Sequence, residues 1–399
     1  MTYDVIIVGA GIVGLATGVN LIQQKPGVRI LILEKELKVA AHQTGHNSGV
    51  IHSGIYYKPG SLKALNCRRG YEKLLQFCNE HEIEYDICGK VIVATNENEI
   101  PYLETLYKRG LENGLEGLKI LNEKELKEYE PYANGIKAIH VPQTGIIDFK
   151  KVAQKYADFI RGNGGEIIFN AFVKDAVEKT DKVEVVTRDV AYTSKYLITC
   201  AGLNSDRIAQ TTSPHIPVQI IPFRGEYYKI KEEKKHLVKN LIYPVPDPNF
   251  PFLGVHFTRM IDGKVEAGPN AVLAFKREGY EKFDLSLRDT FETFTWPGFL
   301  KVAKKYWRTG FGEFYRSFSK KAFVEELQKL LPSITIDDIE TGGSGVRAQA
   351  CDYSGGLLDD FYIEKDKRVI HVLNAPSPAA TASLAIGETI AKQIPSVNE

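Results

Sequence analysis

The sequence predicts an α/β protein made of a Rossmann-like nucleotide-binding domain and a second, mostly antiparallel β-sheet domain. At the N-terminus an apolar run breaks into a glycine-rich turn and a helical stretch. Helix and strand patterns then alternate through residues 149–200, and Pro-punctuated strands without long helices fill residues 216–276. With 399 residues the chain exceeds the size at which one core keeps growing, so we expect two domains that share a cleft.

The first element is a phosphate-binding turn. The strand that ends at Val8 leads into Gly9-x-Gly11-x-x-Gly14 and a helix. Gly9 permits the tight turn, Gly11 lets the backbone approach a pyrophosphate, and Gly14 lets the helix pack on the strand. The second strand, 28–34, ends in Glu34, which is placed to accept hydrogen bonds from a ribose diol. The sequence therefore predicts that the chain binds an adenine dinucleotide.

The following elements continue the nucleotide domain. A polar loop at 42–57 is unusually long for a β-α crossover, and long loops in compact domains tend to be functional. We expect helices at 62–81 and 149–162, and a strand at 195–200. That strand ends at a second glycine turn, 201–206, which belongs at the ligand crevice.

The domain boundaries follow from these patterns. After a helical and basic stretch the chain returns at 342–347, and residues 374–383 open a last helix that runs to Ala391. We therefore expect a discontinuous cofactor domain and a substrate domain between its pieces. The cofactor domain comprises 1–85, 149–215 and 331–399, and the substrate domain comprises 86–148 and 216–330.

Composition excludes several classes of protein. Lys plus Arg (51) nearly balances Asp plus Glu (50), so no global field draws the chain to nucleic acid. The five cysteines are odd in number and lack C-x-x-C spacing, which predicts reduced thiols in a cytoplasmic protein, and we expect no metal site. The apolar stretch 5–22 contains the glycine turn and has no basic leader, so we expect neither a signal peptide nor a membrane span.

Three distant segments point to FAD rather than to a nicotinamide cofactor. The loop after Glu34, the turn at Gly202 and the start of the last helix all look directed at one ligand. At these places the chain resembles the FAD-dependent oxidoreductases of the D-amino-acid oxidase and glycerol-3-phosphate dehydrogenase type. Within them it is similar to the L-2-hydroxyglutarate oxidase/dehydrogenase family. The motifs are HQTGHNSGVIHSGIYY (42–57), CGKVIVAT (88–95), PFRGEYY (222–228), PFLGVHFTR (251–259), GPNAVLAFKREGY (268–280), GVRAQA (345–350) and NAPSPAAT (374–381).

The resemblance covers nearly the whole chain, least well at 281–330. It implies oxidation of the small dicarboxylate L-2-hydroxyglutarate to 2-oxoglutarate by hydride transfer to FAD, with oxygen or a membrane quinone as electron acceptor. The alternatives are an amino-acid or amine oxidase, a glycerol-3-phosphate dehydrogenase-like enzyme, and a flavin-binding protein without turnover. The expected cofactor-binding residues are Gly9, Gly11, Gly14, Glu34, Thr44, Asn47, Ser48, Val173, Gly202, Ser377, Ala379, Ala380 and Thr381.

Flavin-dependent oxidation of an alcohol needs a base for the hydroxyl proton and cations for the carboxylates. Histidine is the natural base at neutral pH. His256, beside Arg259, and His52, in the loop that passes the flavin in similar enzymes, are the two candidates. The alternatives are a packed strand histidine for His256 and a structural contact with the flavin for His52.

Arg347 is the candidate for the C1 carboxylate, because its setting resembles that of a substrate-anion arginine and a guanidinium fits a carboxylate bidentately. Arg224, Arg259 and Lys58 compete for the second carboxylate, although salt bridges to Glu226 or Asp262, or exposure to solvent, would also explain them. Tyr57 either donates its hydroxyl to the substrate or packs. Residues 377–381 open a helix whose N–H groups would stabilise charge on the reduced flavin.

One further stretch, 296–321, carries eight aromatic residues and seven Lys or Arg against a single acid. A basic, aromatic amphipathic segment is what an enzyme uses to rest on an anionic lipid surface, here the inner face of the cell membrane. Trp296, Phe299, Trp307 and Phe311 would supply its apolar part. The alternative is a lid over the active site whose basic side faces water.

Overall fold

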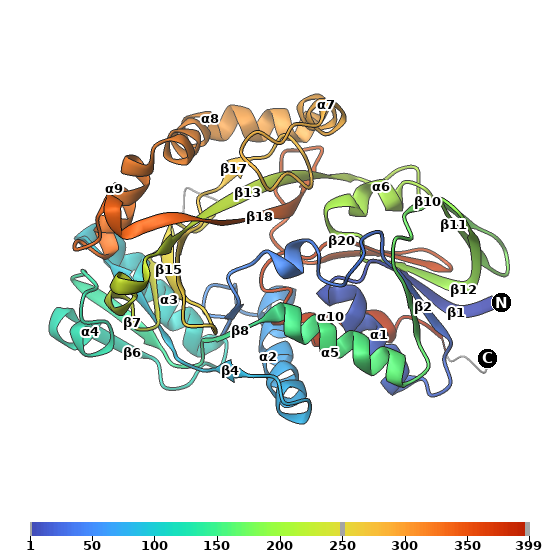
Figure 1. Cartoon of the computed structure of the whole chain (residues 1–399), viewed down its shortest axis with the longest axis horizontal. Coiled ribbons are helices and arrows are strands. Elements are labelled where there is room, and N and C mark those ends of the chain that lie inside the picture. Colours follow the sequence, from blue (N-terminus) through green and yellow to red (C-terminus); the bar gives the residue numbers. More distant parts are fainter. Residues whose placement is uncertain (1, 248–251, 396–399) are drawn as a thin grey trace.

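The computed structural model describes residues 2–247 and 252–395 and has two large β-sheets side by side (Figure 1). The first sheet has eight strands, with the parallel order β12-β1-β2-β9 at its centre and antiparallel strands β10 and β11 at one end. β20 pairs in parallel with β12, and β19 is antiparallel to β20. The strands are β1 (Thr2–Val8), β2 (Ile30–Leu33), β9 (Glu166–Ile168), β10 (Val173–Glu178), β11 (Val183–Thr187), β12 (Ala191–Thr199), β19 (Tyr362–Lys365) and β20 (Val369–Asn374).

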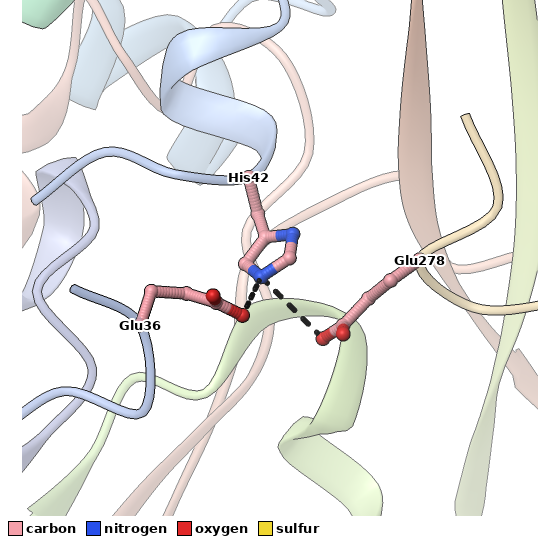
Figure 2. Close-up of side chains that lie close together, drawn as sticks. All are labelled: Glu36, His42 and Glu278. Atoms are coloured by element: carbon pink, nitrogen blue, oxygen red, sulfur yellow. Dashed lines mark hydrogen bonds and ion pairs between the residues drawn. The ribbon is translucent and has the colours of Figure 1, made fainter. Parts of the chain in front are cut away.

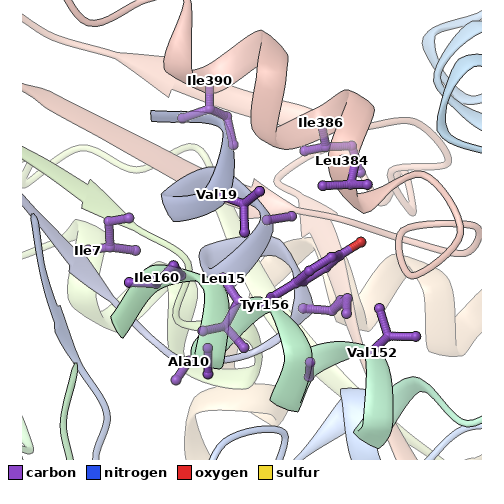
Figure 3. Packing of buried hydrophobic residues seen from close by; sticks show 14 of the residues in the cluster. Ile7, Ala10, Leu15, Val19, Val152, Tyr156, Ile160, Leu384, Ile386 and Ile390 are labelled. Atoms are coloured by element: carbon purple, nitrogen blue, oxygen red, sulfur yellow. The ribbon is translucent and has the colours of Figure 1, made fainter. Parts of the chain in front are cut away.

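Three helices cover one face of this sheet and form its core (Figure 3). They are α1 (Ile12–Gln24), α5 (Phe149–Gly162) and α10 (Ser383–Ala391). α1 and α10 approach closely because Gly387 has no side chain, and a Cβ there would lie 2.6 Å from the backbone of Ala16. The Asn20 side chain adds a hydrogen bond from Nδ2 to the Leu384 carbonyl, 3.1 Å long. The C-terminal helix is thereby fixed against the N-terminal nucleotide unit.

The second sheet has nine strands and is mostly antiparallel. β13 and β18 form a long antiparallel pair within it, and β14 pairs in parallel with β5. Its strands are β5 (Lys90–Ala94), β6 (Lys119–Asn122), β7 (Lys137–Val141), β13 (Val218–Ile230), β14 (Leu241–Pro244), β15 (His256–Arg259), β16 (Val265–Gly268), β17 (Val272–Leu273) and β18 (Ile339–Asp352). A small third sheet joins the two parts and consists of β3 (Val50–Ile51), β4 (Tyr85–Asp86) and β8 (Gly145–Ile147).

Two of the remaining helices belong to the first part of the molecule, where α2 packs against α10 and α6 contacts β20. The others lie on the second sheet, and α7 and α8 run along the upper edge of the molecule, over β13 and β18 (Figure 1). These remaining helices are α2 (Leu62–Glu80), α3 (Ile100–Glu112), α4 (Glu123–Tyr129), α6 (Ser205–Ala209), α7 (Leu287–Thr295), α8 (Pro297–Phe318) and α9 (Lys320–Leu330). Within residues 2–247 and 252–395, no helix combines the length and apolar character that a bilayer-spanning segment needs.

These features confirm the predicted fold class, and α5 begins and ends at the expected residues. One expected boundary is wrong. We assigned 331–399 to the cofactor domain, but β18 pairs with β13 along its length, from Ile230 with Ile339 to Val218 with Asp352. The hydrogen bonds therefore place 339–352 in the second sheet. The chain rejoins the first sheet only at β19 and β20.

Candidate active site

The glycine turn after β1 leaves room for a ligand at one of its three glycines. Gly9 has φ +104°, and a Cβ there would lie 2.5 Å from the Cys200 carbonyl oxygen. A Cβ at Gly14 would lie 2.1 Å from the Gly9 oxygen, so both glycines are required for the close packing of strand and helix. At Gly11 the nearest atom, Thr44 Oγ1, is 3.5 Å away, and this glycine lines a cavity.

The start of α1 is suited to an anion. The Ile12 N–H donates to Thr44 Oγ1 at 3.0 Å, while the next N–H groups of the first turn have no acceptor inside the helix. No acidic residue lies in that turn. Free N–H groups and the positive end of the helix dipole favour a phosphate at this place. The residues present therefore fit the pyrophosphate of a dinucleotide.

Glu34 is buried at the end of β2 and fastens this turn. One of its carboxylate oxygens accepts a hydrogen bond from the Ala10 N–H at 2.7 Å, and the other accepts from the Glu36 N–H at 2.9 Å. Each oxygen retains a second acceptor position for a ribose hydroxyl. Sequence reasoning did not anticipate the bracing of the loop, and the ribose contact stays a prediction.

A cavity of about 840 Å³ runs from this turn to the second sheet. It brings together many of the predicted residues, namely Gly11, Thr44, Asn47, Ser48, His52, Tyr57, Gly202, Arg224, His256, Arg347, Ser377, Ala379 and Ala380. Outside its lining lie Gly9, Gly14, Glu34, Lys58, Val173, Arg259 and Thr381. Val173 packs in the core on the opposite side of the first sheet, with Val183 and Leu197 among its neighbours, so its cofactor role also stays a prediction.

Arg347, on β18, presents an unpaired positive charge to the cavity. Its side chain is exposed there, and its guanidinium carbon lies 5.3 Å from the Phe252 ring centroid. It forms no ion pair with any carboxylate in residues 2–247 and 252–395. Surrounding protein lowers the pKa of Arg347 by desolvation, but a guanidinium remains protonated at neutral pH. This site is suited to a carboxylate.

None of the three predicted second anchors presents a free cation to the cavity. Arg224 is buried and donates twice to Glu226 Oε1, at 3.1 and 2.9 Å, and once to the Glu281 carbonyl. Arg259 pairs with Asp86 at 2.5 Å, outside the cavity, rather than with Asp262. Lys58 is exposed and also lies outside the lining. We therefore correct this expectation, because the two arginines already satisfy carboxylates of the protein.

His256 has the geometry of a base. It is buried at the start of β15, and its Nδ1 lies 2.9 Å from the Gly254 carbonyl, which can only accept a hydrogen bond. Nδ1 therefore carries the proton and Nε2 keeps a free lone pair. The ring stacks on Tyr243 with 3.9 Å between centroids. Burial lowers the pKa of His256 to about 4, so the imidazole is neutral at pH 7.

His52 lies in the same cavity. Its Nε2 is 3.3 Å from Ser377 Oγ, and its backbone N–H donates to Thr381 Oγ1 at 3.1 Å. Burial, followed by the charge of Lys90, lowers the pKa of His52 to about 3. Both candidate histidines are therefore neutral, and His52 is tied to the C-terminal turn.

That C-terminal turn differs from the expected helix start. α10 begins at Ser383, after turns at 377–382, and residues 375–380 line the cavity. The Ala379 N–H donates to the Pro376 carbonyl at 2.9 Å, and the Ala382 N–H donates to the Pro378 carbonyl at 2.9 Å. The amides of Ala379 and Ala382 are thus used inside the turn, and stabilisation of the reduced cofactor by the other N–H groups of 377–381 stays a prediction.

Sequence reasoning missed several groups of the site. Lys63 lines the cavity, pairs with Asp359 at 2.7 Å and lies 5.3 Å from the Tyr57 ring centroid. Arg109, Tyr56 and Tyr227 also line it. Lys90 lies behind the wall, and it had a signal in the sequence: a lysine that opens an otherwise apolar strand.

A second cluster joins the two parts of the molecule near the cofactor loop (Figure 2). Ligand atoms of Glu36, His42 and Glu278 lie within 4.8 Å of one another. The Lys35 ammonium lies 2.9 Å from a Glu278 carboxylate oxygen and 3.0 Å from His42 Nε2, and it also pairs with Glu36. Because this ammonium takes the place that a metal cation would occupy, the cluster is an ion-pair network between β2 and the 276–280 segment.

The basic aromatic segment forms α8 with a kink at Tyr306. Two of its four predicted apolar contacts point inward: Phe299 is 5% exposed, and the Trp296 indole N–H donates to the Cys351 carbonyl at 3.0 Å. Trp307 and Phe311 are 54% and 69% exposed. Residues 281–330 are all described and none of them lines the cavity, which disfavours the lid.

Comparison with known proteins gave consistent matches over the whole chain. Residues 4–393 match the family model described as FAD dependent oxidoreductase. The chain is 58% identical to the L-2-hydroxyglutarate dehydrogenase of Indibacter alkaliphilus, over 98% of each protein. It is 46% identical to the mitochondrial L-2-hydroxyglutarate dehydrogenase of Homo sapiens, over 98% of this chain and 89% of that protein.

Solved structures show the same fold at low identity. The L-alpha-glycerophosphate oxidase of Mycoplasma pneumoniae, a structure with FAD bound, aligns with a TM-score of 0.80 and 22% identity over 98% of this chain and 95% of that one. The glycine oxidase of Bacillus cereus aligns with a TM-score of 0.72 and 17% identity over 98% and 95%.

Proposed function

The chain belongs to the FAD dependent oxidoreductase family, as its motifs predict, and we propose that it oxidises L-2-hydroxyglutarate to 2-oxoglutarate. The observation that carries the proposal is one cavity that holds a dinucleotide turn, an unpaired arginine and a neutral histidine with a free nitrogen. Oxidation of a 2-hydroxy acid needs these three elements. FAD, when bound, supplies the acceptor for the hydride that leaves the C2 carbon.

The residues that would hold FAD come from three separate segments. Gly11 and the first turn of α1 would receive the pyrophosphate, and Glu34 the ribose. Thr44, Asn47, Ser48, Gly202, Ala379 and Ala380 line the same cavity and would complete the site. Because these segments are distant in sequence, binding of FAD is expected to stabilise the folded protein.

Arg347 would bind the C1 carboxylate of the substrate. Its guanidinium has no carboxylate partner in the described chain and faces the cavity, so two parallel hydrogen bonds to a substrate carboxylate are available. Such a bidentate contact fixes the orientation of the acid and hence of its C2 hydrogen. Tyr57 lines the cavity and is close enough to Arg347 to influence its pKa, which is consistent with a contact to the same carboxylate.

His256 would remove the hydroxyl proton. Its Nδ1–H is held by the Gly254 carbonyl, so Nε2 is the atom that accepts the proton. A low pKa in the free enzyme keeps this nitrogen unprotonated before the substrate binds. His52 is the alternative base, but the contact between its Nε2 and Ser377 favours a role in positioning the C-terminal turn.

The test is anaerobic mixing of the purified yellow protein with 2-hydroxy acids and amino acids. L-2-Hydroxyglutarate should bleach the flavin band, and L-lactate, which lacks the distal carboxylate, should do so with a far lower kcat/KM. Equal values for the two acids would remove the dicarboxylate assignment. Reduction by L-amino acids in place of hydroxy acids would favour the amino-acid oxidase alternative.

We also propose that the exposed face of α8 attaches the enzyme to an anionic membrane, where a quinone can accept the electrons. Four aromatic residues at positions i, i+4, i+8 and i+11 share one face and are 54 to 69% exposed: Trp307, Phe311, Tyr315 and Phe318. Phe283 and Leu287, from the preceding loop and α7, are 86% and 81% exposed. Beside them lie exposed cations without a carboxylate partner among the described residues: Lys301, Lys304, Lys305 and Arg308.

This combination favours lipid as the partner. Apolar patches of this kind on soluble proteins mark interaction sites, and the neighbouring positive charge complements anionic headgroups. The face lies outside the cavity lining, so attachment leaves the substrate site open.

A further inference from the structure

Lys90 is a buried cation directly behind the cavity wall. It opens β5 and is 2% exposed. Its Nζ lies 4.2 Å from the ring centroid of Tyr56 and 4.9 Å from that of Tyr243. Both tyrosines line the cavity, and Tyr243 stacks on the base candidate His256. The ammonium is therefore separated from the substrate space by one layer of side chains.

The charge of Lys90 is uncompensated in the described part of the chain. No carboxylate forms an ion pair with it there, and its ammonium lies against the rings of Tyr56 and Tyr243. The other two candidate cations of the cavity are each held by a neighbouring group, although Arg109, like Lys90, forms no ion pair with a described carboxylate. Lys63 pairs with Asp359 at 2.7 Å, and Arg109 donates to the Tyr56 carbonyl at 2.8 Å. A buried, unpaired lysine is unfavourable for stability, which indicates a functional reason for its presence.

The surroundings of Lys90 contain further titratable groups but no acid. They are the phenols of Tyr56 and Tyr243, the thiol of Cys67, and the imidazoles of His52 and His256. Burial lowers the pKa of Lys90 to about 7. The charges of both Lys90 and Arg347 also lower the pKa of His52, so both cations act on the same cavity.

We propose that Lys90 is the specificity-determining residue of this cavity, and that its positive charge selects a substrate with a second, distal carboxylate. The inference rests on the proposed function, in which Arg347 binds the carboxylate next to the reacting carbon. A dianion that approaches the wall of Tyr56 and Tyr243 is attracted by the ammonium behind it. In a poorly solvated cavity one such charge changes affinity by roughly 10- to 100-fold.

The experiment measures binding to the oxidised, FAD-containing enzyme with acids that cannot be oxidised. Glutarate carries two carboxylates and butyrate carries one, and neither has a hydroxyl group. Calorimetric titration at pH 8 in two buffers of different ionisation enthalpy reports affinity and the protons taken up. At pH 8 the Lys90 amine is mostly neutral, and a 10- to 100-fold preference of the dianion for the charged form would raise its pKa by about one to two units, so binding of glutarate to the wild type should be accompanied by uptake of about 0.4 to 0.8 proton.

Three variants separate charge from structure. At pH 8, where only about a tenth of the wild-type amine is charged before binding, Lys90→Met should bind glutarate about 2- to 10-fold more weakly, take up no proton and bind butyrate as the wild type does. Lys90→Arg keeps a permanent charge, so it should retain selectivity for glutarate without proton uptake. Lys119→Met, on exposed β6 of the same sheet, is the matched control and should behave as the wild type. Because Lys90 has no acid partner, Lys90→Met should keep or raise the melting temperature.

Two results would overturn the inference. One is equal loss of glutarate and butyrate affinity in Lys90→Met, which indicates a purely structural role. The other is loss of glutarate selectivity in Lys63→Met with none in Lys90→Met, which assigns the distal carboxylate to Lys63. Turnover of L-2-hydroxyglutarate by the wild type tests the proposed function separately, so the two can fail independently.

Discussion

Replacing Arg347 with lysine tests the central contact of the proposed mechanism. The guanidinium lies over the Phe252 ring and has no carboxylate partner among the described residues, so its donors are available to the substrate. Lysine preserves the positive charge but cannot form the two parallel hydrogen bonds of the guanidinium. The substitution therefore removes the bidentate hydrogen-bond geometry and keeps the positive charge.

The expected magnitude follows from the hydrogen bonds that are lost. One charge-assisted hydrogen bond contributes about 1.5–3 kcal/mol, so Arg347→Lys should lower kcat/KM by roughly 10- to 150-fold. Arg347→Met leaves the substrate carboxylate without a partner and should lower kcat/KM further. The total loss of transition-state stabilisation should be about 2–5 kcal/mol or more. Because no ion pair within the protein is broken, the melting temperature should change little.

The assay is anaerobic stopped-flow reduction of the flavin over a range of substrate concentrations. L-2-Hydroxyglutarate and L-2-hydroxybutyrate share the C1 carboxylate, so Arg347→Lys should lower kcat/KM for both by the same factor. Arg259→Lys is the matched control, because Arg259 pairs with Asp86 outside the cavity. The absorbance of bound FAD shows that the site remains intact in each variant.

Two results would refute this reasoning. If Arg347→Lys stays within about threefold of the wild type, a bidentate contact is absent, because its loss requires at least tenfold. If only the reaction of L-2-hydroxyglutarate is impaired, Arg347 binds the distal carboxylate and the assignment of the two ends is reversed.

Three further predictions concern the base, the cofactor and the membrane. His256→Ala should slow anaerobic flavin reduction by about 10²–10⁴-fold with FAD retained, and a normal rate there with a collapse in His52→Ala would reverse the assignment. In the wild type, the free-enzyme kcat/KM should not decrease from neutral pH down to about pH 5 and should fall below about pH 4, where His256 becomes protonated. Glu34→Ala should weaken FAD binding, measured by titration of apoprotein, by about 1.5–3 kcal/mol, and unchanged affinity would remove the ribose contact. Co-sedimentation with anionic vesicles should be lost at high salt, and it should be lost in a variant in which Lys301, Lys304, Lys305 and Arg308 become Gln. Each of these cations should contribute on the order of 1 kcal/mol to the binding. Binding that does not depend on lipid charge would contradict the membrane face.

Local sequence was sufficient for the elements whose interactions are short in range. The glycine turn was predictable because Gly9, Gly11 and Gly14 act on a strand and helix that adjoin them in the chain. α5 was predictable because its apolar positions Val152 and Tyr156 repeat at helical spacing. Arg347 and His256 were predicted as site residues from motifs, and both line the cavity.

Other features depend on which distant residues become neighbours. The pairing of β18 with β13 was not predictable, because a strand carries no local mark of its partner. Arg259 was expected beside Asp262 in the chain, but the fold places Asp86 within 2.5 Å of it. Phe299 and Phe311 have the same chemistry on one helix, yet one is buried and the other is exposed, since only the first faces β13 and β18.

The charges of the site likewise depend partly on local sequence and partly on tertiary contacts. From the sequence, a motif distinguished Arg347, whereas Arg224 and Arg259 remained competing candidates for the second carboxylate, and Lys90 was one lysine among many. The tertiary structure supplies acids to Arg224 and Arg259 and none to Arg347 or Lys90. Composition and motif thus determined the cofactor and the class of reaction, because these depend on residue type and local spacing. Which cations remain free for a substrate was decided only by the fold, because ion pairing depends on distances between segments that the sequence leaves far apart.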